Sequence, residues 1–286
     1  MDTKWFDIAT AQGHTATVFS QTVLDDLNNL NGFDILILSN GLVNVPANRQ
    51  TTMQQFVSLG GSAYIQAEYQ TTQPGNEVFA NVVNGLGGSF TWTGEGTGNL
   101  IPMTVTGDLA SMDGNTVSEV DHFWYGAYGS GDQYTIPFLE YQNNHYGFIY
   151  CSPDPAHGKI ITTSDQDWIR LDYSLELAEN ILSFLAIDDS FSVPSIFISV
   201  SNDQPCVDEP VTYTANLGPT TADVIYQWVV NGVEVPGATD EGYTAVFQEG
   251  DMVSVDISFD LGCAHADVSS PPLLSLIHIS EPTRPY

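Results

Sequence analysis

FDILILSNG, residues 33–41, is the stretch on which the fold of the N-terminal part depends. Its four consecutive apolar residues stand between an aspartate and a Ser-Asn-Gly turn. Such an uninterrupted apolar run is typical of a strand buried on both faces of a parallel sheet. The next segment carries Met53, Phe56 and Val57 at helical spacing and stops at the glycine pair 60–61. We therefore predict a strand followed by a helix.

The same alternation of strand and helix continues on both sides of this stretch. Apolar runs predict strands, and apolar stripes at helical spacing predict helices. The strands are expected at 15–19, 62–68 and 159–164, and the helices at 74–88 and 171–186. Between 88 and 150 the pieces alternate as antiparallel strands do. We therefore predict an α/β doubly wound, flavodoxin-like domain with an antiparallel β insertion over residues 1–187.

The C-terminal part has a different pattern. DDSFSVPS, residues 188–195, has the composition of a linker. Beyond it, Val253, Val255 and Ile257 alternate with polar residues, as a strand with one face in water requires. Several strand-sized pieces with turn signals and a central tryptophan predict an all-β immunoglobulin-like sandwich over 196–270.

The N-terminal part contains, in order, FDILILSNG, a helix ending in LGG, SAYIQAEY, and later GKIITTSDQDWI before ENILSFL. With these segments it resembles the class I glutamine amidotransferase-like fold, especially its trehalose-utilisation-type members. In that family the turn after the strand that follows the glycine pair carries a nucleophilic cysteine near a histidine. Here that turn reads QAEY at 66–69, and the later strand ends in SDQDW at 164–168. The resemblance therefore implies a degenerate domain that lacks this chemistry, and it favours a protein that is not an enzyme.

The carboxyl ends of the predicted strands are where a doubly wound sheet binds its ligands. The candidate acid–base residues there are Glu68, Asp165 and Asp167, and the candidate ligand-binding residues are Ser39, Asn40, Tyr69 and Trp168. Paired carboxylates predict a hydrolase or a carbohydrate-modifying enzyme if their pKa values differ. The alternative is that an aspartate after a strand caps the next helix.

An aromatic run offers a second candidate surface. Trp124 and Tyr125 follow His122-Phe123 and are interleaved with glycines through residue 131. Aromatic faces suit the stacking of sugar rings, so the run predicts carbohydrate binding, and the alternative is packing within the β insertion.

Charge and spacing limit the partners. Lys and Arg total 5 against 35 Asp and Glu, for a net charge of −30. Such acidity repels phosphate backbones and anionic lipid, which excludes nucleic acid and a bare membrane surface as partners. No apolar run is long enough to span a bilayer. The histidines lack zinc-binding spacing and no EF-hand loop is present, so we expect no metal or cofactor, although the acidity leaves calcium open.

The C-terminal part contains the segments QPCVDEPVTYTA, YQWVVNGVEVPGATDEGYTA and QEGDMVSVDIS. These three segments resemble the immunoglobulin-like and PKD-like repeats of large secreted proteins of Bacteroidetes-type bacteria. This resemblance implies an extracellular or cell-surface location and a disulfide between Cys206 and Cys263, with two unpaired thiols as the alternative. We expect a fragment of a multidomain bacterial protein with a non-catalytic binding or scaffolding role. Its ligand would be a carbohydrate or another cell-surface molecule, and further domains of the same chain would be its partners.

Both ends of the chain depart from these patterns. The doubly wound interpretation predicts a central strand before residues 1–11, so we expect Met1 to be internal to a longer protein. LSLIHISEPTR, residues 274–284, matches the translation of a transposase adapter used in sequencing libraries at every position. We therefore expect residues 271–286 to be a linker remnant and an adapter-derived artefact, and no function is assigned to them.

Overall fold

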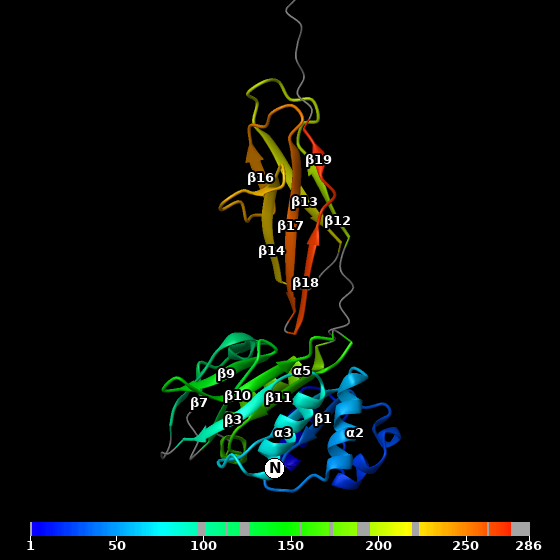
Figure 1. Ribbon diagram of the computed structural model, residues 1–286, viewed down its shortest axis with the longest axis vertical. Helices are drawn as coiled ribbons and strands as arrows, with labels where there is room; N and C mark the ends of the chain where they lie inside the picture. Colours follow the sequence, from blue (N-terminus) through cyan, green and yellow to red (C-terminus); the bar gives the residue numbers. More distant parts are fainter. Residues whose placement is uncertain are drawn as a thin grey trace, which may run out of the picture. The chain divides into compact units, whose positions relative to one another are not determined.

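The chain divides into two compact units, Met1–Ser190 and Phe191–Tyr286, and each is described by itself (Figure 1). The computed structural model describes residues 2–96, 101–112, 114–120, 126–154, 156–171, 174–187, 195–218, 223–261 and 263–275. Trp124 and Tyr125 lie outside these ranges, as does the predicted linker apart from Ser195. Within these ranges, none of the helices combines the length and apolarity needed to cross a membrane.

Nine strands of the described N-terminal unit form one mixed sheet, in the order β1-β2-β11-β10-β9-β4-β7, with β8 pairing with both β10 and β3. The parallel strands of this sheet are β1 (Ile35–Leu38), β2 (Ser62–Gln66) and β11 (Lys159–Thr163). The antiparallel strands are β3 (Phe90–Glu95), β4 (Met103–Val105), β7 (Glu119–Val120), β8 (Ala127–Gly131), β9 (Thr135–Tyr141) and β10 (Asn144–Cys151). A separate hairpin pairs β5 (Ser111–Met112) with β6 (Asn115–Thr116).

This topology shows that the predicted doubly wound, flavodoxin-like fold is wrong. The antiparallel strands are not an insertion beside a parallel sheet, because β10 pairs directly with β11 and continues the same sheet. A parallel pair needs a long crossover connection, whereas two residues suffice to join an antiparallel pair. β9 and β10 are joined by Gln142 and Asn143, which have φ values of 49° and 62°. This two-residue connection imposes antiparallel pairing on β9 and β10, whereas the pairs β3–β8 and β4–β9 join segments far apart in the sequence.

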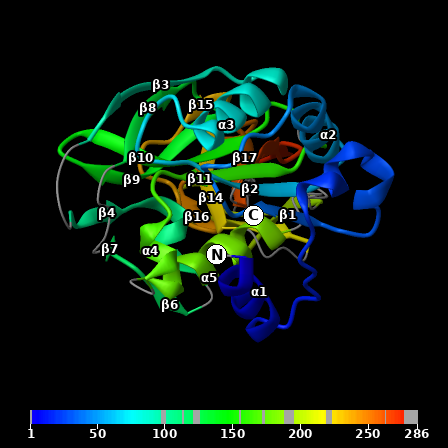
Figure 2. The same cartoon turned by 90° about the horizontal axis from the view of Figure 1, so that it is seen from below.

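Helices cover both faces of the three parallel strands (Figure 2). α2 (Ala47–Ser58) and α3 (Pro74–Gly85) cover one face, where their apolar side chains share a core with Ala63 and Ile65 of β2. α1 (Asp2–Ala11) and α5 (Leu175–Ala186) cover the other face, where the Trp5 ring lies 4.7 Å from the Tyr64 ring, centroid to centroid. The short helices are η1 (Gln21–Asp25), η2 (Leu27–Leu30), η3 (Gly107–Ala110) and α4 (Asp167–Arg170).

The strand predicted at 15–19 does not form. Residues 14–20 belong to no helix or strand, and Val18 and Phe19 are each 53% exposed. A strand exists only where a neighbouring strand accepts its backbone hydrogen bonds, and no described strand pairs with this segment. The apolar pattern of TATVF predicted burial, but the fold leaves these side chains at the surface.

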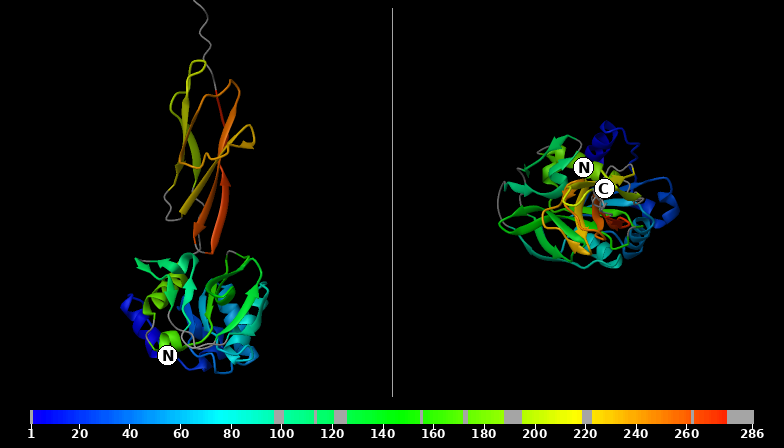
Figure 3. Two further views of the ribbon diagram at one scale, coloured as in Figure 1. Left: turned by 90° about the vertical axis from the view of Figure 1, so that its left-hand side faces the viewer. Right: turned by 90° about the horizontal axis from the view of Figure 1, so that it is seen from above.

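The described part of the C-terminal unit consists of strands in two sheets (Figure 3). The first contains β12 (Ile196–Val200), β13 (Val211–Leu217) and β16 (Gly242–Ala245), and the second contains β14 (Asp223–Val230), β15 (Val233–Glu234), β17 (Met252–Leu261), β18 (Ala264–Ser269) and β19 (Leu273–Leu274). One core joins Tyr213 of the first sheet to Trp228 and Val255 of the second. The predicted alternation therefore places its apolar residues between two sheets.

One turn of this unit follows from local sequence. Asn231 and Gly232 join β14 to β15 with φ values of 54° and 78°, as an Asn-Gly hairpin turn requires. Leu274, the first residue of the adapter-like stretch, pairs with Met252. Residues 276–284 of that stretch lie outside the described ranges.

The predicted disulfide between Cys206 and Cys263 is wrong. Cys206 is a free, exposed thiol, and the disulfide-bonded cysteines are Cys151 and Cys263. A disulfide requires Cα atoms within about 7 Å of each other, and sequence order does not supply that distance.

Candidate functional site

The candidate carboxylates follow two adjacent parallel strands. Glu68 lies just after β2, while Asp165 and Asp167 lie just after β11, and the pair Thr163–Gln66 aligns the two strand ends. The charges of both aspartates act on Glu68. The structure therefore brings together the three carboxyl groups that the sequence singled out.

Glu68 is buried, with 2% of its surface exposed. Its backbone is clamped by Asn76 of α3, whose Oδ1 accepts from the Glu68 N–H at 2.8 Å and whose Nδ2 donates to the Glu68 carbonyl at 3.3 Å. Among the described residues, Glu68 Oε1 has no hydrogen-bond partner. Burial first, and then the negative charges of Asp165 and Asp167, raise the pKa of Glu68 to about 8. Glu68 is therefore mainly a neutral acid at pH 7.

Two glycines press neighbouring loops against this strand end. A Cβ at Gly41 would lie 2.6 Å from Glu68 Cγ, and a Cβ at Gly75 would lie 2.1 Å from the Gln66 carbonyl oxygen. The Gly75 N–H also donates to the Gly41 carbonyl at 2.7 Å. These contacts enclose Glu68 between the loop after β1 and the start of α3, so its carboxyl group is shielded from large substrates.

The two aspartates have structural partners. Asp165, which has a φ of 61°, accepts through Oδ1 from the Asp167 N–H at 3.0 Å. Asp167 pairs with Arg170 Nε at 2.7 Å. Asp165 thus accepts from the N–H of the first residue of α4, but the N-cap position is Gln166, which makes no side-chain cap hydrogen bond. Asp167 is paired with the Arg170 cation. Within the described ranges, no three His, Cys, Asp or Glu side chains are placed to hold a metal ion.

A buried polar network beneath this site was not predicted. Tyr64 Oη lies 2.7 Å from Gln66 Oε1 and 2.6 Å from Thr163 Oγ1, and Trp168 Nε1 donates to the same Thr163 oxygen at 3.0 Å. Burial raises the pKa of Tyr64, so the phenol stays neutral. Trp168 has no exposed surface. It is therefore a core residue in this structure and does not present its ring to solvent.

The remaining candidates within the described ranges, Ser39, Asn40 and Tyr69, follow β1 and β2. Tyr69 is 41% exposed, whereas Ser39 is buried. Asn40 Oδ1 accepts from the Leu42 N–H at 3.0 Å and closes the turn after β1. Ser39 and Asn40 also line a large cleft, which the sequence-based site did not include.

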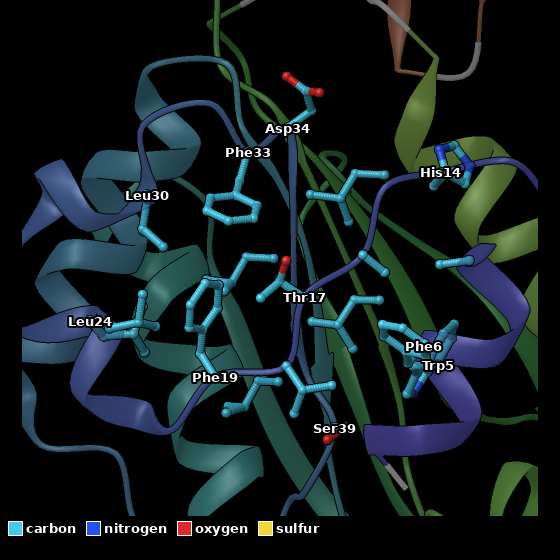
Figure 4. A pocket seen from close by; sticks show the side chains of 18 of the residues that line it. Trp5, Phe6, His14, Thr17, Phe19, Leu24, Leu30, Phe33, Asp34 and Ser39 are labelled. Atoms are coloured by element: carbon cyan, nitrogen blue, oxygen red, sulfur yellow. The ribbon is translucent and has the colours of Figure 1, made fainter.

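This cleft, of about 790 Å³, runs along β1 and is called here the β1 cleft (Figure 4). Its walls are β1 with its flanking residues 32–40, the unpaired segment 13–21, and one side of α1. Asp34 lies at one end of β1 and Ser39 at the other, with Thr17 facing the middle (Figure 4). The four residues of β1 are all half-buried, while every residue of β2 and β11 is buried. ILIL is therefore partly exposed, although its uninterrupted apolar run predicted a strand buried on both faces.

Comparisons with known proteins place this chain in no family. No family model matches the sequence, and no curated protein matches it. The mmIFT52 N-terminal domain is similar in structure, with a TM-score of 0.49, 12% identity, and coverage of 66% of this chain and 92% of that chain. The cytoplasmic protein STM3548 from Salmonella typhimurium has a TM-score of 0.47, 14% identity, and coverage of 64% and 86%. Both TM-scores lie under 0.5, and the resemblance to amidotransferase-like domains stays a prediction.

Proposed function

We propose that the N-terminal unit is a non-catalytic binding domain whose ligand lies in the β1 cleft. The observation that carries this proposal is the cleft itself, which combines a free strand edge with apolar side chains from α1 and the segment 13–21. A concave, mostly preformed cavity of several hundred Å³ with apolar walls and a few polar groups is the usual form of a ligand site.

The residues that follow β2 and β11 support a role without catalysis. The turn at 66–69 offers no cysteine, serine or threonine as a nucleophile. Glu68 is enclosed, Asp165 binds a backbone N–H, and Asp167 is paired with Arg170. Binding at β1 requires none of these groups to react.

A cell-surface location belongs to this proposal. Disulfides persist in oxidising compartments, and Cys151 and Cys263 are disulfide-bonded. The acidic surface would keep such a domain soluble and away from anionic lipid. The two-sheet C-terminal unit would then serve as a spacer toward further domains, and a carbohydrate is one ligand class to screen.

Thr17 allows a direct test of the cleft. Thr17→Trp places a large ring in the middle of the β1 cleft, and Thr51→Trp on the exposed side of α2 is the matched control. The neutral apolar dye Nile red should bind the unmodified protein and Thr51→Trp equally and bind Thr17→Trp about tenfold more weakly. Equal binding by all three proteins would refute the assignment of the cleft as the ligand site. A glycan array on the same proteins tests the carbohydrate class.

Glu68 favours a second candidate, a hydrolase that uses a protonated carboxyl as general acid. A pKa of about 8 and an unpartnered buried oxygen are what such an acid requires. Chromogenic glycoside and ester substrates should then be cleaved, with activity lost in Glu68→Gln and kept in Glu77→Gln, which changes an exposed carboxyl of α3. Absence of turnover from both the unmodified protein and its variants would exclude this candidate for those substrates.

A further inference from the structure

The free edge of β1 has unused backbone hydrogen-bonding groups. The Asp34 carbonyl accepts from the Ser62 N–H of β2 at 2.8 Å. Because backbone groups alternate in direction along a strand, Leu36 and Leu38 also face β2, whereas Ile35 and Ile37 direct their N–H and C=O groups to the other side. Among the described strands, only β2 pairs with β1. The edge at Ile35 and Ile37 therefore opens into the β1 cleft.

The side chains of β1 lack the cover that a second neighbouring strand would supply. Both faces of the parallel strands carry helices, yet none of the four residues of ILIL is fully buried. The opposite wall mixes polar and apolar side chains, and its Val18 and Phe19 are each 53% exposed. A long apolar edge with free hydrogen-bonding groups is a template for pairing with another strand.

The size of the cleft suits a short strand. Strand residues rise about 3.3 Å, neighbouring strands lie about 4.8 Å apart and packed layers about 10 Å apart, so one strand residue occupies about 160 Å³. The cleft volume of about 790 Å³ thus accommodates about five residues. This length matches the four residues of β1 with one flanking position.

The charge around the cleft favours a ligand with positively charged ends. Asp34 is the acidic side chain that lines the cleft, and Asp7 is exposed on α1 outside the lining. The whole chain holds only 5 Lys and Arg against 35 Asp and Glu. Positively charged ends are attracted to such a surface, and negatively charged ends are repelled.

We propose that the β1 cleft binds an extended peptide, with alternating apolar side chains and basic flanks, that adds to β1 as a strand. This inference rests on the function proposed above and names its ligand class. Main-chain hydrogen bonds to Ile35 and Ile37 would supply affinity, and the apolar walls would select the alternate side chains.

The probe is a fluorescein-labelled peptide, Lys-Lys-Val-Thr-Val-Thr-Val-Lys-Lys, titrated with the full chain and followed by fluorescence anisotropy. Two further versions carry N-methyl groups on one or the other alternating set of the five central residues. At least one of these patterns should weaken binding about tenfold, because it removes the N–H groups that pair with β1. A version with glutamate flanks should also bind more weakly at low ionic strength. If no version binds, or if both methylated peptides bind as well as the parent, the proposal is wrong.

Amide hydrogen exchange measured by NMR locates the bound peptide. Bound peptide should slow exchange at Ile35 and Ile37 and leave Leu36, which already faces β2, unchanged. Binding without this alternation would overturn the strand-addition geometry. Thr17→Trp should abolish peptide binding and Thr51→Trp should not.

These measurements separate the two proposals. Nile red binding that is lost in Thr17→Trp while no peptide binds would keep the cleft as a ligand site and reject the peptide. Concentration-dependent dimers in analytical ultracentrifugation that disappear in Thr17→Trp would assign the edge to a second copy of the chain and overturn the peptide proposal. Glycan binding that the peptide does not displace would overturn it as well.

Discussion

Glu68→Gln tests the environment of the buried carboxyl through the pH dependence of stability. This substitution keeps the shape of the side chain and removes its titration. In the folded protein the pKa of Glu68 is raised from 4.5 to about 8, so the folded state binds a proton that the unfolded state releases between these values. The free energy of unfolding therefore falls as pH rises from 4.5 to about 8, and below 4.5 Glu68 contributes no pH dependence.

The magnitude follows from the size of the shift. One pKa unit corresponds to about 1.4 kcal/mol, so the rise from 4.5 to about 8 corresponds to about 5 kcal/mol once the pH is well above 8. The stability of Glu68→Gln relative to the unmodified protein should thus increase by about 3 to 4 kcal/mol between pH 5 and pH 8.

Urea unfolding followed by tryptophan fluorescence at pH 5, 6, 7 and 8 measures this difference. Comparing variant with unmodified protein at each pH cancels the titration of all other groups that the substitution leaves unchanged. Glu77→Gln, at an exposed position of α3, is the matched control for the loss of a carboxyl group. A gap between Glu68→Gln and the unmodified protein that stays constant within about 1 kcal/mol from pH 5 to pH 8 would refute the assignment of a buried, protonated carboxyl.

Three further substitutions probe the packing. Gly75→Ala should cost about 2 kcal/mol or more in urea unfolding, because its Cβ would lie 2.1 Å from the Gln66 carbonyl oxygen. Trp168→Phe should cost about 2 kcal/mol in the same assay, because it removes the 3.0 Å hydrogen bond to buried Thr163 and leaves space in the core. Cys206→Ser should change the free energy of unfolding by less than about 0.5 kcal/mol, because the thiol is free and exposed.

A matched glycine substitution serves as the control for Gly75→Ala. Gly242→Ala places a Cβ 3.7 Å from the Tyr213 carbonyl oxygen, an ordinary van der Waals contact, and should be tolerated far better than Gly75→Ala. A neutral Gly75→Ala would show that the start of α3 is not pressed against the end of β2. If Cys206→Ser lowered the free energy of unfolding by several kcal/mol, the predicted disulfide of Cys206 would be supported instead.

Local patterns predicted the elements of this protein well where neighbours in sequence decide the outcome. The ILIL run forms β1, the apolar stripe after Pro74 forms α3, and Asn231-Gly232 forms a hairpin turn. The alternation of Val253 and Val255 with polar residues is also realised in the core of the C-terminal unit. Periodicity and turn chemistry act over a few residues, so they can be read from sequence.

The pairing of those elements could not be predicted in the same way. Strand direction depends on which partner each strand meets, and the antiparallel joining of β10 to β11 overturned the doubly wound prediction. TATVF found no partner among the described strands and stayed at the surface, although its composition resembles that of the buried strands. The identity of the disulfide-bonded cysteines likewise depends on distances created by folding.

Some features of the candidate site also followed from the sequence, and others depended on the tertiary structure. The sequence by itself determined that carboxylates follow two strands and that the turn at 66–69 offers no nucleophile. Only the tertiary structure decided that Glu68 is enclosed and protonated, that Asp165 and Asp167 have structural partners, and that β1 borders a cleft. The physical reason is that desolvation, charge proximity and an unpaired strand edge are properties of residues distant in sequence that folding brings together.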